Sequence, residues 1–196
     1  MTQTSEQRRT QLLQAAFEII AEKGLEGLRT RDVVARAGVN ISTLHYYFAT
    51  KSDLIGAVIA HLRNVFTTSD TEVATKECSE PLLRHLLDGW QRLRTAPYLS
   101  ATLQELLARA HRDAVAKAAF TTIHAHWNGL VESLIREGMA AGRLRSDIDP
   151  RAVARAMTSF VMGARAQAAV SSAPFDFESA ARQLVHCLSA VPKKAL

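Results

Sequence analysis

Apolar and polar residues follow one another along most of the chain with the period of an amphipathic α-helix. Near the N-terminus, Leu13, Phe17 and Ile20 share one face of a helix predicted over residues 5–23. Further helices with one apolar face are predicted over residues 51–68, 81–94, 97–111, 113–141 and 150–170, and after Pro174. Together with two short helices between residues 28 and 51, the pattern predicts an all-α fold of about nine helices.

These two short helices are predicted to be joined by a tight turn. The hydroxyl of Thr30 is suited to cap the first helix, and Gly38 ends it because glycine tolerates the left-handed conformation at a helix C-terminus. Asn40 is suited to cap the second helix, which continues to Phe48. The segment is therefore predicted to be a helix-turn-helix.

The second of these helices turns Leu44 and Phe48 toward the core and leaves hydroxyl, imidazole and phenol groups on its other sides. Bases offer hydrogen-bonding edges and the thymine methyl in the major groove, so such a helix is typical of proteins that bind there. The next helix begins with a variant of the capping box, formed by Thr50 and Asp53. Its free backbone N–H groups, with Lys51 beside them, indicate a phosphate-binding site.

The segment from Thr30 to Lys51, preceded by a helix that ends in the residues E-K-G-L-E-G, resembles the TetR family of bacterial one-component transcriptional regulators. The resemblance is specific from about residue 8 to residue 54 and beyond that rests on helix order and length. It implies a three-helix DNA-binding domain over residues 1–50 and a larger helical domain over residues 51–196 that dimerises and holds a ligand. The helix over about 51–68 would connect them.

The resemblance also implies roles for individual residues, although His45 stands where members of the family often carry tyrosine. Contacts with base edges are expected from Ser42, Thr43 and His45. Ile41 meets a thymine methyl or simply packs. Contacts with the DNA backbone are expected from Thr30, Arg31, Tyr46, Tyr47 and Lys51. The alternative interpretation is a structural helical corner that binds no DNA.

In the larger domain, aromatic and polar side chains lie on the inward faces of helices that enclose the ligand pocket in the family. The candidate ligand-binding residues are Trp90, Phe120, His124, Trp127, Met157 and Phe160. Ordinary core packing is the alternative for each of them, and Arg165 is either an anchor for an acidic ligand or a surface arginine. The last two helices are rich in alanine and glycine, which lets backbones approach closely, so we expect them to form a homodimer interface.

Net charge alone is weak support for DNA binding. The chain carries +5, but residues 1–62 hold seven Lys or Arg and six acidic residues, so the excess lies elsewhere. DNA binding is supported instead by the positions of the basic residues in the sequence. The residues that flank the predicted helix-turn-helix are Arg8, Arg9, Arg29, Arg31 and Lys51. No apolar run has the length of a membrane span, and the N-terminus is polar without a signal-peptide pattern, so we expect no membrane association and a cytoplasmic location.

The sequence gives little support for a disulfide, a metal site or a catalytic site. Cys78 and Cys187 have no metal-ligand spacing, which favours buried thiols over a disulfide, with a redox switch as the alternative. His124 and His126 point to different faces of a helix, so no metal site is expected. No catalytic or nucleotide-binding motif is present, so we expect neither an enzyme nor a cofactor.

The sequence therefore predicts a ligand-responsive transcriptional repressor. It would bind a palindromic, double-stranded DNA operator as a homodimer and be released by a small-molecule inducer. The alternative is a helical small-molecule-binding protein of the same fold that does not bind DNA. The polar face of the second short helix distinguishes the two, because a protein that no longer binds DNA has no need to keep it.

Overall fold

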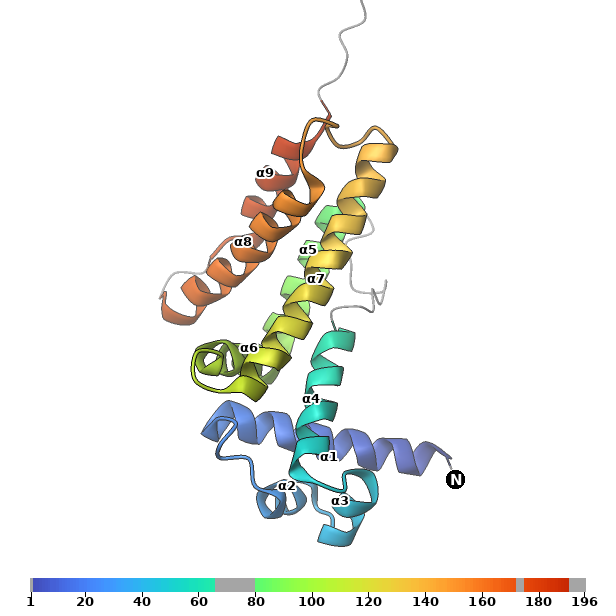
Figure 1. The fold of residues 1–196 in the computed structure, drawn as a ribbon, viewed down its shortest axis with the longest axis vertical. Helices are drawn as coiled ribbons and strands as arrows, with labels where there is room; N and C mark the ends of the chain where they lie inside the picture. The colour runs from blue at the N-terminus through green and yellow to red at the C-terminus, as the bar shows by residue number, and fades with distance from the viewer. Residues whose placement is uncertain (1, 66–79, 172–174, 191–196) are drawn as a thin grey trace, which may run out of the picture. The chain divides into compact units, whose positions relative to one another are not determined.

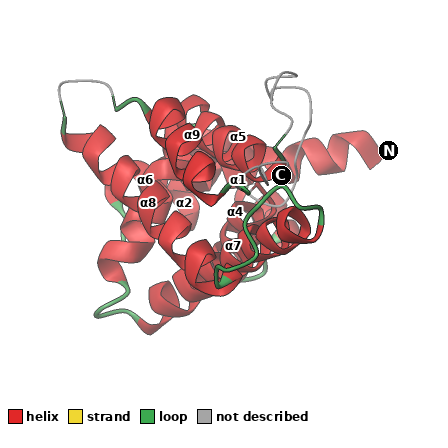
Figure 2. Cartoon of the chain, turned by 90° about the horizontal axis from the view of Figure 1, so that it is seen from above, coloured by secondary structure: helices red, strands yellow, loops and turns green. Residues whose placement is uncertain are grey.

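A computed structural model of the chain describes residues 2–65, 80–171 and 175–190. Within those residues it contains nine α-helices and, apart from an isolated bridge between Leu144 and Ser189, no extended strand pairing (Figures 1 and 2). The prediction of an all-α fold with about nine helices is confirmed.

The described helices follow one another along the chain from α1 to α9. Their bounds are α1 Thr2–Lys23, α2 Thr30–Ala37, α3 Ile41–Tyr47, α4 Lys51–Val65, α5 Pro81–Thr95, α6 Pro97–Arg109, α7 Ala114–Ala140, α8 Pro150–Val170 and α9 Phe177–Leu188. Most predicted ends agree with these to within a few residues, and α1 begins earlier than predicted. The predicted last turn of the connector helix, the polar stretch after it and Cys78 lie outside the described residues.

Glycine follows the end of three helices, α1, α2 and α7. Gly24, Gly38 and Gly142 have φ angles of 70°, 64° and 69°, the left-handed region that other residues enter at a cost. At the other end, α8 begins with Pro150 directly after Asp149, whose carboxylate accepts a hydrogen bond from the Arg151 N–H at 2.9 Å. Local sequence therefore sets where these helices begin and end.

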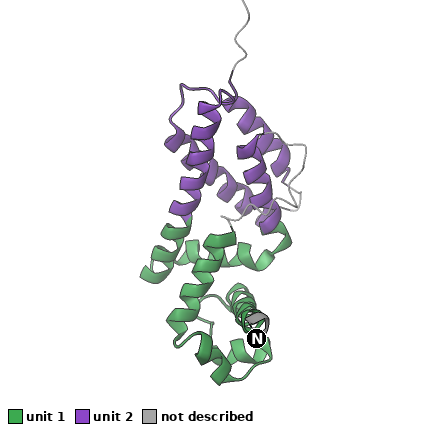
Figure 3. Ribbon diagram, turned by 90° about the vertical axis from the view of Figure 1, so that its right-hand side faces the viewer, with its two compact units in different colours: residues 1–65, 93–123 green, residues 66–92, 124–196 purple. Residues whose placement is uncertain are grey.

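The chain forms two compact units (Figure 3). The first holds residues 1–65 and 93–123, and the second holds the described residues among 66–92 and 124–196. Helix α6 therefore belongs to the same unit as the helix-turn-helix. The functional division at residue 50 that the sequence predicts stays a prediction.

In the first unit, α6 holds the turn that leads out of α1. The carboxylate of Glu105 accepts hydrogen bonds from the Leu25 N–H at 3.1 Å and from the Arg109 Nε at 2.5 Å. Arg109 also forms an ion pair with Glu26 at 2.8 Å. A Cβ on Gly24 would lie 2.7 Å from the same carboxylate, so the absence of a side chain there makes room for it. Leu25 is buried, so this acceptor satisfies a backbone group that water reaches poorly.

The core of the second unit is formed by α5, α7, α8 and α9 around an aromatic cluster. Trp90 stacks on Phe177 with ring centroids 4.2 Å apart, and Phe160 stacks on the same phenyl ring at 5.3 Å. Phe175 lies at the edge of both Trp90 and Phe160. Met157 is buried in the same core. Four predicted ligand residues, Trp90, Trp127, Met157 and Phe160, therefore make core contacts in this unit.

Candidate nucleic-acid interface

The helix-turn-helix is built by local hydrogen bonds around its turn. Gly38 donates from its N–H to Ala35 O, and the next N–H, from Val39, reaches Val34 O at 3.1 Å. The Asn40 side chain then caps α3 by accepting from the Thr43 N–H at 2.8 Å, as the sequence predicted. The prediction that Thr30 caps α2 is wrong. Arg29 holds the N-cap position without a side-chain bond, and Thr30 is already helical because the chain turns one residue earlier.

The predicted inward side of α3 is confirmed, since Leu44 is fully buried and Phe48 is 3% exposed. The remaining side chains of α3 face outward: Ile41, Ser42, His45 and Tyr46 are exposed, and Thr43 and Tyr47 are half-buried. Tyr46 is 79% exposed, a large aromatic surface that contributes little to this chain's own core. Exposed polar and aromatic groups on one short helix form a surface suited to binding a partner.

Among the described residues, one local contact holds the imidazole of His45. Its Nδ1 lies 3.3 Å from the carbonyl oxygen of Ala49, and because a carbonyl only accepts, Nδ1 must carry the proton. In the neutral ring Nε2 is then an acceptor, which suits a donor such as the exocyclic amino group of cytosine or adenine. The ring is thus oriented while its other nitrogen remains able to bind a partner.

Two residues near the start of α1 support the end of α3. The Ser5 hydroxyl lies 3.0 Å from the Tyr47 hydroxyl, and the Arg9 guanidinium lies over the Phe48 ring at 5.6 Å from its centroid. Sequence reasoning missed Ser5, because its partner lies 42 residues away and no local pattern joins them. Arg9 was noticed only for its charge, and its position over Phe48 brings that charge beside the exposed helix.

The start of α4 presents the predicted capping box. Thr50 donates from its N–H to Asp53 Oδ2 at 2.8 Å, and the Asp53 N–H donates to the Thr50 Oγ1 at 3.1 Å. Lys51 is exposed at this terminus, and so is Arg31 at the start of α2. Both cations are therefore accessible to a phosphate backbone, whose contacts fix a protein's register on DNA.

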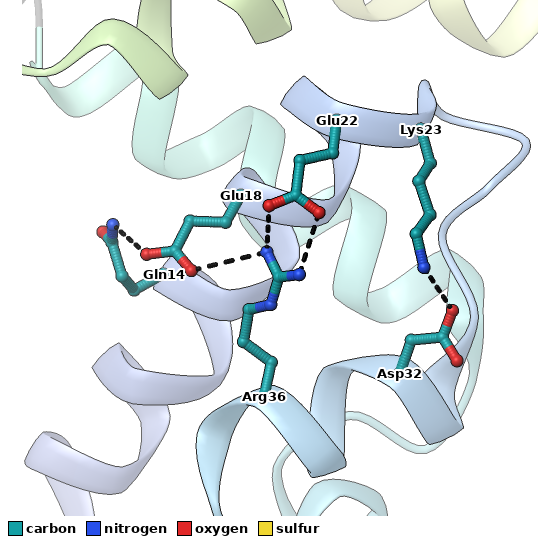
Figure 4. Close-up of polar contacts among 6 residues, drawn as sticks. All are labelled: Gln14, Glu18, Glu22, Lys23, Asp32 and Arg36. Carbon is teal, nitrogen blue, oxygen red and sulfur yellow. Dashed lines mark hydrogen bonds and ion pairs between the residues drawn. The ribbon is translucent and has the colours of Figure 1, made fainter.

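Salt bridges brace α2 against α1 behind this surface (Figure 4). The Arg36 guanidinium donates to both carboxylate oxygens of Glu22, at 2.6 and 2.8 Å, and lies 3.7 Å from Glu18. Lys23 reaches Asp32 at 3.3 Å. The hydrogen bond from Arg36 lowers the pKa of the Glu22 carboxyl. Glu18 and Glu22 of α1 therefore pair with Arg36 of α2, and Arg31 lies 3.6 Å from the neighbouring Asp32.

Two of the predicted ligand residues of the second unit, Trp127 and His124, form polar contacts. The Trp127 indole N–H donates to His85 Nε2 at 3.0 Å, and Nδ1 of His124 lies 3.0 Å from the Asn128 side-chain nitrogen. Thr158 donates to Asn128 Oδ1 at 2.6 Å. Phe120 belongs to the first unit, so the six predicted residues are divided between the two. Sequence reasoning missed His85, which only packing brings to Trp127. It also missed Asn128, which lies four residues after His124 on α7 but meets Thr158 of α8 only through packing.

The fold and the exposed α3 define a helix-turn-helix regulator of transcription, and comparisons with known proteins agree. Residues 12–58 match the family model described as "Bacterial regulatory proteins, tetR family". Residues 80–192, more than half of the chain, match the model described as "BetI-type transcriptional repressor, C-terminal". The chain therefore belongs to the TetR family of transcriptional regulators, whose members bind DNA and are not enzymes.

Curated relatives match parts of the chain. It is 32% identical over 119 residues to the HTH-type transcriptional repressor Rv3405c of Mycobacterium tuberculosis, covering 55% of this chain and 63% of that protein. It is 28% identical over 85 residues to the regulator PksA of Bacillus subtilis, covering 42% of each. The matched region thus spans less than two thirds of either relative.

Solved structures match the fold over nearly the whole chain. A TetR-family regulator from Rhodococcus sp. has a TM-score of 0.77 and 25% identity, covering 93% of this chain and 96% of that one. GusR of Salmonella enterica has a TM-score of 0.74 and 19% identity, covering 92% and 94%. None of the described helices of this chain has the length and apolar character needed to cross a membrane.

Proposed function

We propose that this regulator is a ligand-responsive repressor. It binds a palindromic operator as a homodimer and leaves it when a small molecule occupies the second unit. The observation that carries DNA recognition is the outward face of α3, where polar and aromatic side chains gather on a helix anchored by Leu44 and Phe48. The mycobacterial relative is itself named a repressor, which supports repression here. The site of action is the cytoplasm, where the operator lies.

In this proposal α3 lies in the major groove. Ser42, Thr43 and His45 contact base edges, with His45 accepting through Nε2, and Ile41 meets a thymine methyl. The backbone contacts come from Thr30, Arg31, Tyr46, Tyr47 and Lys51. The Tyr47 ring is held in place for such a contact, because its hydroxyl lies 3.0 Å from that of Ser5.

Dimerisation is proposed through α8 and α9. The outer side of α8 carries small exposed residues, among them Ala152, Ala156 and Gly163. A Cβ on Gly163 would meet nothing within 4 Å, so a second chain has room to approach there. Two other small residues of these helices, Ala164 and Ala181, are instead buried in the core of the second unit. A two-fold axis would place the two α3 helices about 34–36 Å apart, one turn of DNA.

Fluorescence anisotropy of the full chain tests the proposal against DNA from upstream of its own gene, with scrambled competitor and a salt series. We expect tight binding that falls with salt and resists competitor. The variant Lys51→Ala should weaken binding to all sequences and reduce the salt slope by about one. Lys117→Ala, an equal change of charge on α7, is the control.

The variant His45→Ala should relax preference at one base pair, by about 1–3 kcal/mol. If the wild-type chain prefers no sequence, and neither variant changes DNA affinity, the proposal fails. The remaining interpretation would then be a ligand-binding protein of the same fold.

A further inference from the structure

Residues 5–11 of α1 lie outside the core of the first unit. They are exposed, whereas Leu12 is fully buried. Two contacts nevertheless hold this segment against α3: the Ser5 hydroxyl lies 3.0 Å from the Tyr47 hydroxyl, and the Arg9 guanidinium lies over the Phe48 ring. Ser5 and Arg9 are four residues apart, so both lie on the face of α1 that meets the end of α3.

The positive charge on this segment has no acidic partner. Other basic residues of the first unit form ion pairs, namely Arg36 with Glu22, Arg109 with Glu26 and Lys23 with Asp32. Among the described residues, Arg8 and Arg9 form no ion pair, and Glu6, one turn before Arg9, lies beyond ion-pair distance of both. The charge of Arg9 also adds to burial in lowering the pKa of His61 on α4. Arg9 therefore carries a charge near α3 and α4 that no paired carboxylate compensates.

The ring of Phe48 positions the Arg9 guanidinium without using its donors. Phe48 is 3% exposed and directly follows α3, so a group that lies over its ring is placed relative to that helix. The guanidinium has five N–H donors, and among the described residues the Arg9 side chain donates no hydrogen bond. Attraction to a ring face leaves the charge in place. The side chain is thus held beside α3 and able to bind an anion.

We infer that Arg9 is a further DNA-contacting residue, which donates from its guanidinium to a phosphate of the duplex whose major groove α3 enters. The inference rests on the proposed function for its partner, and it extends the DNA-binding surface from the helix-turn-helix to α1. A guanidinium matches the oxygens of a phosphate in pairs, and a side chain already held over Phe48 loses little freedom on binding. Because phosphates carry no base identity, this contact adds affinity for every sequence alike.

The first experiment separates the charge of Arg9 from its packing. Arg9→Met keeps an unbranched chain over the Phe48 ring and removes the charge, whereas Arg9→Lys keeps the charge. Fluorescence anisotropy of the full chain over a salt series gives the affinity for the operator and for a random duplex. Arg9→Met should weaken binding to both by roughly fivefold and reduce the salt slope by about one, and Arg9→Lys should keep the wild-type slope.

Arg94→Ala is the control, because Arg94 is an exposed cation on α5 that belongs to the same unit. Its removal should leave the salt slope unchanged. Circular dichroism checks that the variants are folded. Phosphate ethylation interference then locates the contact: ethylation of one phosphate in each half-site should weaken binding of wild type and of Arg94→Ala, but not of Arg9→Met, whose affinity no longer depends on that phosphate.

The inference is overturned if Arg9→Met keeps the wild-type affinity and salt slope, which would mean that Arg9 only packs on Phe48. It is equally overturned if Arg9→Lys loses as much of the slope as Arg9→Met, or if no phosphate drops out of the interference pattern. Absence of sequence preference in the wild type would refute the proposed regulator, while the salt slope on the random duplex would still test Arg9. A wild type that binds no duplex would refute both.

Discussion

The carboxylate of Glu105 is expected to hold the end of α1 against α6, and the structure allows the cost of losing it to be calculated. Replacing Glu105 with Ala leaves the buried Leu25 N–H without its acceptor, which costs about 1–3 kcal/mol. It also removes the hydrogen bond to Arg109, where the two side chains are 24% and 18% exposed. After discounting for solvent screening, that pair contributes about 0.5–1 kcal/mol. The free energy of unfolding should therefore fall by about 1.5–4 kcal/mol.

Glu105→Gln separates the two contributions. Its amide oxygen still accepts from Leu25, while the charge that Arg109 binds is gone, so the loss should be about 1 kcal/mol. Glu132→Ala is the matched control, because Glu132 also pairs with an arginine four residues on but accepts no distant backbone N–H. Replacing Glu132 with Ala should lower the free energy of unfolding by less than about 0.5 kcal/mol.

Urea unfolding followed by circular dichroism measures these differences, and amide hydrogen exchange gives a local reading. In Glu105→Ala the Leu25 amide should exchange faster, whereas in Glu105→Gln it should keep most of its protection. Equal stabilities for the two Glu105 variants, or unchanged exchange at Leu25, would refute the assignment of the carboxylate as the acceptor that matters.

Three further predictions follow from single positions. Gly24→Ala should destabilise the protein more than Gly38→Ala. An alanine at either position must adopt a left-handed conformation, at a cost of about 1–2 kcal/mol, but only a Cβ at position 24 would meet the Glu105 carboxylate, at 2.7 Å, whereas one at position 38 meets nothing within 4 Å. Equal losses of stability in urea unfolding would contradict this. Gly163→Arg should keep its fold and become monomeric in light scattering, and a dimer of unchanged stability would exclude this face as the interface. In the folded protein the pKa of His85 is about 4, below its ordinary 6.5. The neutral ring therefore contributes fully to the free energy of unfolding above pH 6.5, and this contribution is lost as the pH falls toward 4. Wild type should therefore lose about 2–3 kcal/mol more than His85→Gln between pH 7 and pH 4, and parallel pH profiles would show that His85 is not buried as neutral imidazole.

The sequence by itself determined the features that depend on neighbours within four residues. Gly38 ends α2, Asn40 caps α3, and Thr50 and Asp53 form the capping box of α4, because a short side chain reaches only the adjacent turn. Helical periodicity gave the helix number and the inward side of α3 for the same reason. The error at the Thr30 cap is a shift of a single residue, which periodicity does not define. The thiol of Cys187, predicted to be buried, is exposed, because the position of a residue in a helix does not decide what packs on it.

Tertiary structure alone decided the contacts between distant residues. Glu105 accepts from Leu25 across 80 positions, and Trp127 donates to His85 across 42. No periodicity identifies such partners, because each side chain is equally compatible with solvent until the helices pack. The same packing placed Trp90 in an aromatic stack on Phe177, so the contacts in the core of the second unit became visible only in the folded chain.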